Sequence, residues 1–422
     1  MDNHSIQLKY GRQRLKFQPL QDVEMQILQC RVEPPAASRD EIIQQALSRP
    51  METPPLRRLA EGRRSAVILV SGKTRVTGSQ YFLPHVMAEL EAGGLSADQV
   101  TVVFATGTHE SMTPQDISRV IGGALSVRVR VYGHDCHDRN RLVDIGTTGF
   151  DNRIQAARAV MEADLKILTG RITHHYFAGF TGGSKSILPG VCGFESIRHN
   201  HRMVMSSAGG TDPRATYGNL DDNPVHRDMV EAAELAQPDF IFNTILDHQH
   251  RFQHCVAGHH IAAHRAGCRL ADAVHRRHIG RPAPLVVASC GGYPYDINFM
   301  QTIKTVFNCE KALAPGGTLI LVAECPKGVK QGFWRWFAYP DFAGLDRAVL
   351  ADYDLTGHNT YLVRRFLRQQ RVIMVTSLPP DQVRQLGMTP ARDLADALKI
   401  ADVKAGSLMY VVPDGGTTLL SA

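Results

Sequence analysis

Short runs of apolar and largely β-branched residues recur along the chain, and they constrain its fold more than any other feature. Four of them lie in the first half, at 66–70 (AVILV), 100–104 (VTVVF), 127–132 (VRVRVY) and 165–168 (LKIL), with helical segments between them. A strand that is buried on both faces is apolar throughout, because neither face meets water. The pattern therefore predicts an α/β fold with largely parallel sheets that are covered by helices.

The segment 170–193 (GRITHHYFAGFTGGSKSILPGVCG) concentrates side chains that can carry chemistry. Glycines let a backbone approach a phosphate or a flat ligand, a lysine can bind phosphate or act as a nucleophile, and histidines can bind a metal or move protons. The segment and the residues just after it supply Gly179, Gly182, Gly183, Lys185, His174, His175, His199 and His201. We interpret it as a cofactor site. The spacing of the last two histidines suits metal ligation by one of them rather than by a helical i, i+4 pair.

Two other interpretations of this segment stay open. Residues 179–186 (GFTGGSKS) are one residue short of a Walker A loop, since Ser184 stands where a glycine should precede the lysine. A P-loop follows its strand directly and opens a helix, whereas here 173–178 intervene and Pro189 follows. A glycine turn of purely structural use is the second alternative. A P-loop-like nucleotide-binding protein is therefore kept as a competing hypothesis.

Polar loops follow two other apolar runs of the first half, at 71–75 (SGKTR) and 105–109 (ATGTH). Ligands of open α/β sheets bind beyond the carboxyl ends of the strands, so Arg75 and His109 are candidate site residues. The guanidinium of Arg75 could hold both oxygens of a carboxylate. Taken alone, Arg75 could equally be an ordinary surface residue, and a histidine such as His109 is more often a surface or capping residue than a base.

The cycle of strand and helix is interrupted at 280–284 (GRPAP), which predicts a hinge, and then restarts. At 422 residues the chain also exceeds the size of one hydrophobic core. We expect two α/β domains, 1–278 with the cofactor site and a smaller one at 279–422, and an active-site cleft between them. In the second domain Gln301 and Lys304 lie three apart on one helical face and could point into that cleft.

Composition excludes several classes of function. Hydrophobic residues make up 43% and charged residues 21%, as in ordinary globular proteins, and no apolar run approaches the roughly 20 residues that cross a bilayer. The start of the chain lacks the pattern of a signal peptide, so we expect a cytoplasmic protein with no membrane partner. The eight cysteines form no CxxC pair, which argues against structural zinc and a disulfide framework. The net charge of +6 is modest and the basic clusters lack interleaved aromatics, so no nucleic-acid partner is expected.

Taken together and in order, these motifs resemble the nickel-dependent lactate racemase family. The resemblance runs from the Tyr10-Gly11 turn to the glycines at 415–416 and covers most of the chain. It is carried by Thr74-Arg75, Gly107-Thr108-His109, the HxxAGFxGGxK motif from His175 to Lys185, Asn200-His201, and Tyr293-Pro294 with Gln301 and Lys304.

The resemblance implies a racemase or epimerase that acts at a hydroxyl-bearing carbon of a 2-hydroxy acid or sugar-like substrate by reversible hydride transfer. The implied cofactor is a nickel-pincer nucleotide, covalently linked to Lys185, with its nickel bound by His201. The implied residue roles are catalytic bases at His109 and His175, substrate and cofactor contacts at Arg75, Gln301 and Lys304, and cofactor-facing glycines at Gly179, Gly182 and Gly183. The implied partners are the small-molecule substrate and the proteins that synthesise the cofactor.

Three positions depart from the family pattern. Gly72 stands where an aspartate is common, Met300 stands where an aromatic residue often precedes the glutamine, and His358 stands near a position that is tryptophan in lactate racemases. The departures leave the substrate open among lactate, a larger 2-hydroxy acid and a sugar-like compound. A catalytically silent relative that binds an anionic ligand is the remaining alternative.

Overall fold

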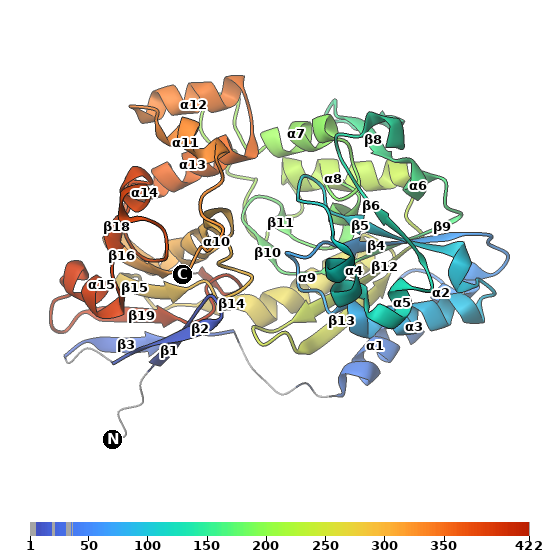
Figure 1. Ribbon diagram of the computed structural model, residues 1–422, viewed down its shortest axis with the longest axis horizontal. Helices are drawn as coiled ribbons and strands as arrows, with labels where there is room; N and C mark the ends of the chain where they lie inside the picture. The colour runs from blue at the N-terminus through green and yellow to red at the C-terminus, as the bar shows by residue number, and fades with distance from the viewer. Residues whose placement is uncertain (1–5, 19–21, 31–34, 36, 422) are drawn as a thin grey trace. The chain divides into compact units, whose positions relative to one another are not determined.

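The computed structural model describes residues 6–18, 22–30, 35 and 37–421, which form two α/β units (Figure 1). Unit 1 contains Met1–Arg31, Met205–Gly210 and His275–Ala422, and unit 2 contains Val32–Val204 and Thr211–Val274. Each unit has its own parallel sheet and its own buried core. The predicted fold class, two α/β bodies with largely parallel sheets, is confirmed.

Unit 2 is built on a six-stranded sheet in the order β13-β12-β9-β4-β5-β6. Its strands are β4 (Ala66–Ser71), β5 (Val100–Ala105), β6 (Arg130–Gly133), β9 (Leu165–Arg171), β12 (Phe240–Leu246) and β13 (Phe252–Gly258). All neighbouring strands are parallel except β12 and β13. β12 is buried at every residue, as a strand covered on both faces must be.

Three of the four predicted strands of this sheet are confirmed, and the fourth is shorter than predicted. The run at 127–132 becomes strand only from Arg130, because Val127 is the helical C-cap of a preceding turn and its side chain is 84% exposed.

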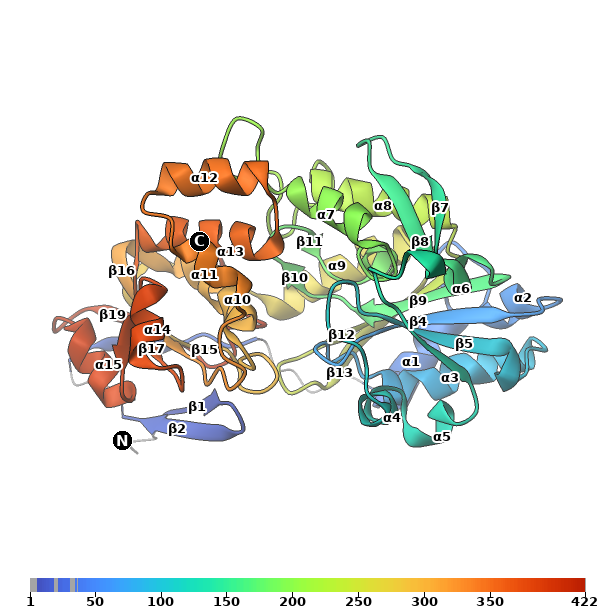
Figure 2. The ribbon, with the colours of Figure 1, turned by 45° about the horizontal axis from the view of Figure 1, so that its top comes forward.

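The helices of unit 2 cover both faces of its sheet. They are α1 (Arg39–Ser48), α2 (Leu56–Ala60), α3 (Ser79–Ala92), α4 (Pro114–Ile121), α5 (Gly123–Ser126), α6 (Arg158–Met161), α7 (Phe194–Arg202), α8 (Pro224–Ala236) and α9 (Ala262–His275). Figure 2 shows α1 and α3 on one side of the sheet and α7 and α8 on the other. Large side chains such as Phe82 of α3 and Phe242 of β12 fill the core on the first side, with ring centroids 4.8 Å apart. Two small antiparallel ribbons, β7 (Leu142–Thr147) with β8 (Arg153–Ala157) and β10 (His174–His175) with β11 (Gly179–Phe180), complete the unit.

Unit 1 carries a second six-stranded sheet, in the order β18-β17-β16-β15-β19-β3, and all its strands are parallel. The strands are β3 (Glu24–Ile27), β15 (Ala283–Ser289), β16 (Leu313–Val322), β17 (Arg371–Val375), β18 (Thr389–Ala391) and β19 (Leu408–Val412). The helices are α10 (Phe299–Cys309), α11 (Gly332–Phe337), α12 (Phe342–Ala351), α13 (Leu355–Leu367), α14 (Pro380–Gln385) and α15 (Leu394–Ala401). β14 (Arg276–His278) and β20 (Leu419–Ser421) form a separate short parallel pair in the same unit.

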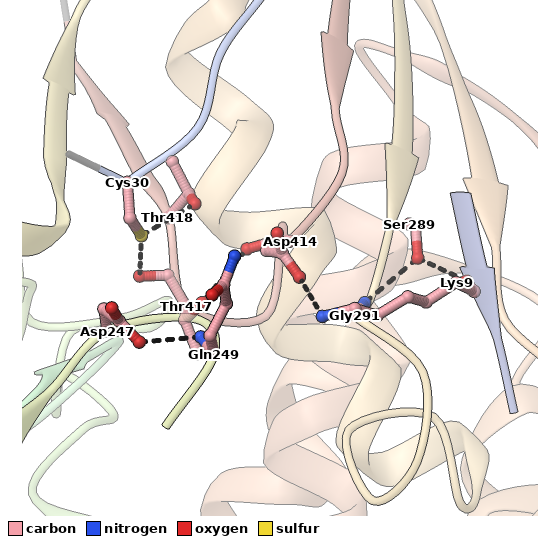
Figure 3. Close-up of polar contacts among 9 residues, drawn as sticks. All are labelled: Lys9, Cys30, Asp247, Gln249, Ser289, Gly291, Asp414, Thr417 and Thr418. Atoms are coloured by element: carbon pink, nitrogen blue, oxygen red, sulfur yellow. Dashed lines mark hydrogen bonds and ion pairs between the residues drawn. The ribbon is translucent and has the colours of Figure 1, made fainter. Parts of the chain in front are cut away.

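The N-terminal segment joins unit 1 rather than the unit that follows it in the chain. β3 pairs with β19 at the edge of the sheet, and the hairpin β1 (Ile6–Tyr10) and β2 (Gln13–Phe17) packs onto the unit 1 core. The hairpin is fixed at the carboxyl end of β15 (Figure 3): Ser289 Oγ donates to the Lys9 carbonyl at 2.5 Å, and Lys9 Nζ pairs with Asp414 at 2.9 Å. The predicted division into 1–278 and 279–422 therefore differs from the contact units, in which the first strands belong with the C-terminal half.

Among the helices of the described residues, none is both long and apolar enough to cross a bilayer.

Candidate active site

The turn that carries Lys185 lies beyond the carboxyl end of β9, in the middle of the unit 2 sheet. The ribbon β10–β11 pairs His175 with Gly179, and a single 3-10 turn, η3 (Gly183–Ser186), follows. Gly179, Gly182 and Gly183 all have positive φ values, of 74°, 80° and 54°. A Cβ at Gly179 would lie 2.3 Å from the Asn219 carbonyl oxygen. At these positions glycine therefore serves the close packing of the turn itself.

The structure of the turn does not favour a P-loop. The segment between β9 and the turn contains the ribbon β10–β11, and the turn continues into Pro189 rather than into an α-helix. A P-loop holds phosphate on the N-terminus of the helix that follows it, and here that helix is missing.

The amine of Lys185 lies in a partly desolvated position. Burial, together with a smaller effect of the nearby positive charge of Arg75, lowers the pKa of Lys185 to about 7. At pH 7 about half of such amines are uncharged, whereas an ordinary lysine is almost wholly protonated. An uncharged amine is a nucleophile, so the site suits covalent attachment of a carbonyl-type group.

Phe177 brings three of the predicted site residues together. Its ring centroid lies 4.4 Å from that of His175, 5.2 Å from that of His201 and 5.6 Å from Lys185 Nζ. Both histidines are buried, at 7% and 8% exposure. His175 is further oriented by Ala178, whose backbone N–H donates to Nδ1 at 3.3 Å.

His201 is placed by a buried polar network at the end of α7. The preceding residue, Asn200, donates from Nδ2 to Asp228 of α8 at 2.8 Å. The fully buried carboxylate of Asp228 also accepts hydrogen bonds from Thr148 and Asn152. Three donors compensate the buried charge and fix α7 against α8, and this fixes the histidine that follows Asn200.

The loops after β4 and β5 come from neighbouring parallel strands, whose ends Ser71 and Ala105 are in register. The Arg75 N–H closes a turn onto the Gly72 carbonyl at 3.0 Å, and the His109 N–H closes another onto Thr106 at 2.9 Å. His109 is exposed.

The loop after β5 is also joined to the lysine segment, because the Gly107 N–H donates to the Gly190 carbonyl at 2.9 Å. Arg75, His109 and the lysine turn thus all follow the carboxyl ends of neighbouring strands, β4, β5 and β9. They lie at the same end of the unit 2 sheet, as the strand topology predicts.

Gln301 and Lys304 lie in unit 1, on α10. Lys304 Nζ donates to Gln301 Oε1 at 3.1 Å, so the two side chains do share one helical face. Beside them, Met300 Sδ accepts from Asn359 Nδ2 of α13 at 3.4 Å. The role of these residues at the site stays a prediction.

Sequence reasoning missed the side chains that support the lysine turn. Asn243 of β12 accepts from the Gly183 N–H at 2.8 Å, and His264 of α9 contacts the same glycine. His174, which the sequence did single out, pairs with Asp272 of α9 at 2.8 Å. No local motif marks Asn243 or His264, because each reaches the turn from a strand or helix more than 50 positions further along the chain.

A metal at this site would need ligands that the protein does not supply. Within the described part of the chain, no group of three or more His, Cys, Asp or Glu side chains is arranged to hold a metal ion. A single buried imidazole such as His201 could complete the coordination of a metal whose other ligands come from a cofactor.

The fold and the residue pattern agree with comparisons to known proteins. Residues 10–212 match the family described as "Lactate racemase N-terminal domain", and residues 280–420 match "Lactate racemase C-terminal domain". The chain is 35% identical to a lactate racemase from Thermoanaerobacterium thermosaccharolyticum over 99% of both chains. It is 31% identical to a lactate racemase from Lactiplantibacillus plantarum over 90% of both.

A solved structure of the lactate racemase apoprotein from Thermoanaerobacterium thermosaccharolyticum has the same fold. Its TM-score is 0.91 at 33% identity, covering 99% of this chain and 100% of that one. A Thermotoga maritima protein, with a TM-score of 0.68 and 18% identity over 93% of this chain and all of that one, shares the fold alone. The two α/β units and these matches together identify the protein as an isomerase of the racemase class. The chain belongs to the lactate racemase family.

Proposed function

We propose that the chain inverts a hydroxyl-bearing carbon of a 2-hydroxy acid, with lactate as the first candidate, by reversible hydride transfer to a nickel-pincer nucleotide attached to Lys185. The observation that carries the proposal is the grouping of Lys185, His175 and His201 around Phe177. The family relation and this grouping support the same chemistry from independent sides.

The residues of the site fit the proposed cofactor. Lys185 has a partly uncharged amine for the covalent link, and its pKa of about 7 follows from burial. His201 offers one buried imidazole as the protein ligand of nickel, which suits a square-planar site completed by the cofactor. When bound, the cofactor would supply a hydride acceptor and donor.

The remaining steps fall to side chains of the chain itself. The guanidinium of Arg75 would hold the substrate carboxylate through two parallel hydrogen bonds. His109 and His175 would each take or return the proton of the substrate hydroxyl, one for each face of the carbon. Imidazole can do this in both directions because its ordinary pKa lies near neutrality. Gln301 and Lys304 would add contacts to the substrate and the cofactor.

The departures from the family pattern bear on substrate choice. Position 72 has little space for a side chain, since a Cβ at Gly72 would lie 3.3 Å from Thr106 Cγ2 and 3.8 Å from Met112 Sδ. Met300 presents a flexible thioether held by Asn359 rather than a rigid ring. We therefore keep larger 2-hydroxy acids and sugar-like acids as candidates beside lactate.

The first test is the mass and metal content of protein made together with the cofactor-synthesis proteins. We expect bound nickel and an added mass on the peptide that contains Lys185. Lys185→Ala should lose the covalent mass, whereas His201→Ala should lose or weaken the nickel and keep the mass. Neither nickel nor added mass on the wild-type protein would overturn the cofactor assignment.

The second test is inversion of a panel of 2-hydroxy acids and sugar acids, followed by chiral separation. In deuterated buffer the product should carry no solvent deuterium at the inverted carbon, because a hydride that is held by the cofactor does not exchange with water. Deuterium at that carbon would instead indicate proton abstraction. If magnesium-dependent ATP binding appeared and Lys185→Ala abolished it, the competing nucleotide-binding hypothesis would be favoured.

A further inference from the structure

His264 packs against the turn that carries Lys185. Its Nε2 lies 2.9 Å from the Thr181 carbonyl oxygen, and because a carbonyl can only accept, this ring nitrogen carries the proton. Two residues later the turn crosses the ring itself, since a Cβ on Gly183 would lie 2.7 Å from His264 Cγ and Cδ2. One side chain of α9 thus holds two successive parts of the turn that ends in Lys185.

A second histidine stands behind the first. The ring of His226, in the first turn of α8, stacks on that of His264 with centroids 5.9 Å apart and an interplanar angle of 22°. The first turn of α8 is fixed by Asn223, whose side chain accepts from the backbone N–H groups of Val225 and His226. His226 and His264 are 6% and 4% exposed, so the pair forms a rigid buried layer.

The two rings stay uncharged over the pH range in which enzymes of this kind operate. Burial lowers the pKa of His264 to about 4 and that of His226 to about 3, and the charge of Lys185 contributes to both shifts. Above about pH 5 the hydrogen bond to Thr181 and the stack between the rings therefore do not change with pH.

We propose that His264, stacked on His226, is a positioning residue that sets the turn and so presents the Lys185 amine to the cofactor. The proposal rests on the proposed function for the purpose of the lysine, although its contacts do not. His264 acts through the backbone at Thr181 and Gly183. Asn243 also holds the turn, by accepting from the Gly183 N–H. Without His264, the Thr181 carbonyl would lose this donor and the backbone at Gly183 would lose the ring that it packs against. Water would then reach the amine.

The test measures the reactivity of Lys185 in the apoprotein, independently of any cofactor. Acetic anhydride would be applied in trace amounts between pH 6 and 9, and labelling of Lys185 would be compared by peptide mass spectrometry with that of exposed Lys399 on α15. Among the charged and titratable groups that act on Lys185, Arg75 stays charged and His226 and His264 stay neutral across this range. These three groups therefore add no titration of their own to the labelling curve.

The wild-type curve should have its midpoint near pH 7. For His264→Ala we expect the midpoint to rise by about one pH unit or more, which lowers relative labelling at pH 6 by about tenfold. His264→Gln keeps an N–H donor for Thr181 and should recover most of the reactivity. His264→Phe keeps the ring under Gly183 without the donor and should fall between the two. His85→Ala on α3 is the matched control and should leave the midpoint unchanged.

The variants also guard against loss of folding. If His264→Ala does not fold, the Phe and Gln variants still separate the donor from the ring. Folded Ala and Phe variants with the wild-type midpoint would overturn the proposal. If the midpoints move as expected but the wild-type protein acquires neither nickel nor mass, the positioning role stands and the cofactor assignment fails. If the cofactor loads equally on wild type and His264→Ala, the proposed function stands and the positioning role fails.

Discussion

Acid should weaken unit 1 through one buried histidine, His358. This residue lies on α13 with no exposed surface, and its Nδ1 is 3.3 Å from the hydroxyl of Tyr353. Burial, with a smaller contribution from the positive charge of Arg365, lowers the pKa of His358 from 6.5 to about 3. The folded unit thus holds an imidazole that stays neutral well below the pH at which it would be protonated in an unfolded chain.

The sign and size of the effect follow from this difference. Between about pH 6.5 and pH 3 the unfolded chain binds a proton at His358 that the folded chain does not. The free energy of unfolding therefore falls as the pH falls through this window. At pH 5, about 1.5 units below the ordinary value, the loss is about 2 kcal/mol, at 1.36 kcal/mol per unit. This is a sizeable part of the stability of a domain.

The assay uses the only two tryptophans of the chain, Trp334 and Trp336, which both lie in unit 1. Their fluorescence would follow urea unfolding of wild type and His358→Gln at pH 7.5 and pH 5. Glutamine does not titrate, so its packing cost appears at both pH values and cancels. The wild type should lose about 2 kcal/mol more than the variant on acidification.

His278→Gln, at an exposed position of unit 1, is the control. It measures how the free energy of unfolding changes with pH when a histidine that is not buried is lost. A wild-type-to-His358→Gln difference that stays constant between the two pH values would refute the reasoning. In that case His358 would have to be solvated or protonated in the folded unit.

Three further predictions concern unit 2. His109→Ala and His175→Ala should each lower kcat by about 10²-fold or more with nickel and covalent mass retained, and full activity of His109→Ala would rule out two bases. Gly183→Ala places a Cβ at positive φ against His264 and should lower the free energy of unfolding by about 1–3 kcal/mol, measured by hydrogen exchange of unit 2 peptides. Asp228→Asn replaces one carboxylate oxygen, in a group that accepts three buried hydrogen bonds, with an NH2 that faces a donor; it should cost about 2–3 kcal/mol in urea unfolding and weaken nickel binding, and unchanged stability would contradict the role of the carboxylate.

Much of the fold follows from local sequence. The runs at 66–70, 100–104 and 165–168 become β4, β5 and β9, because a strand covered on both faces must be apolar at each position. The hairpin around Gly11 is likewise encoded locally, since its turn needs a residue that tolerates a φ of 55°. The error at 127–132 has a local cause too, because alternating Val and Arg do not show where a helical turn ends.

The association of the N-terminal strands with unit 1 could not be predicted in this way. β3 has four residues, mostly exposed, and nothing in them specifies β19 as the partner. Pairing at the edge of a sheet depends on which strand edge is open after the rest of the unit has folded. That information is spread over residues more than 370 positions apart.

The candidate site, like the fold, was predictable from the sequence only in part. The sequence by itself determined which groups could do the chemistry, since Lys185, the glycines before it and the histidines on either side stand in one motif. Only the tertiary structure decided that Phe177 gathers His175 and His201 around the lysine and that His264 supports the turn. The reason is physical: a chemical group is a property of one residue, whereas its burial, and hence its pKa and orientation, is set by side chains that packing brings from distant helices.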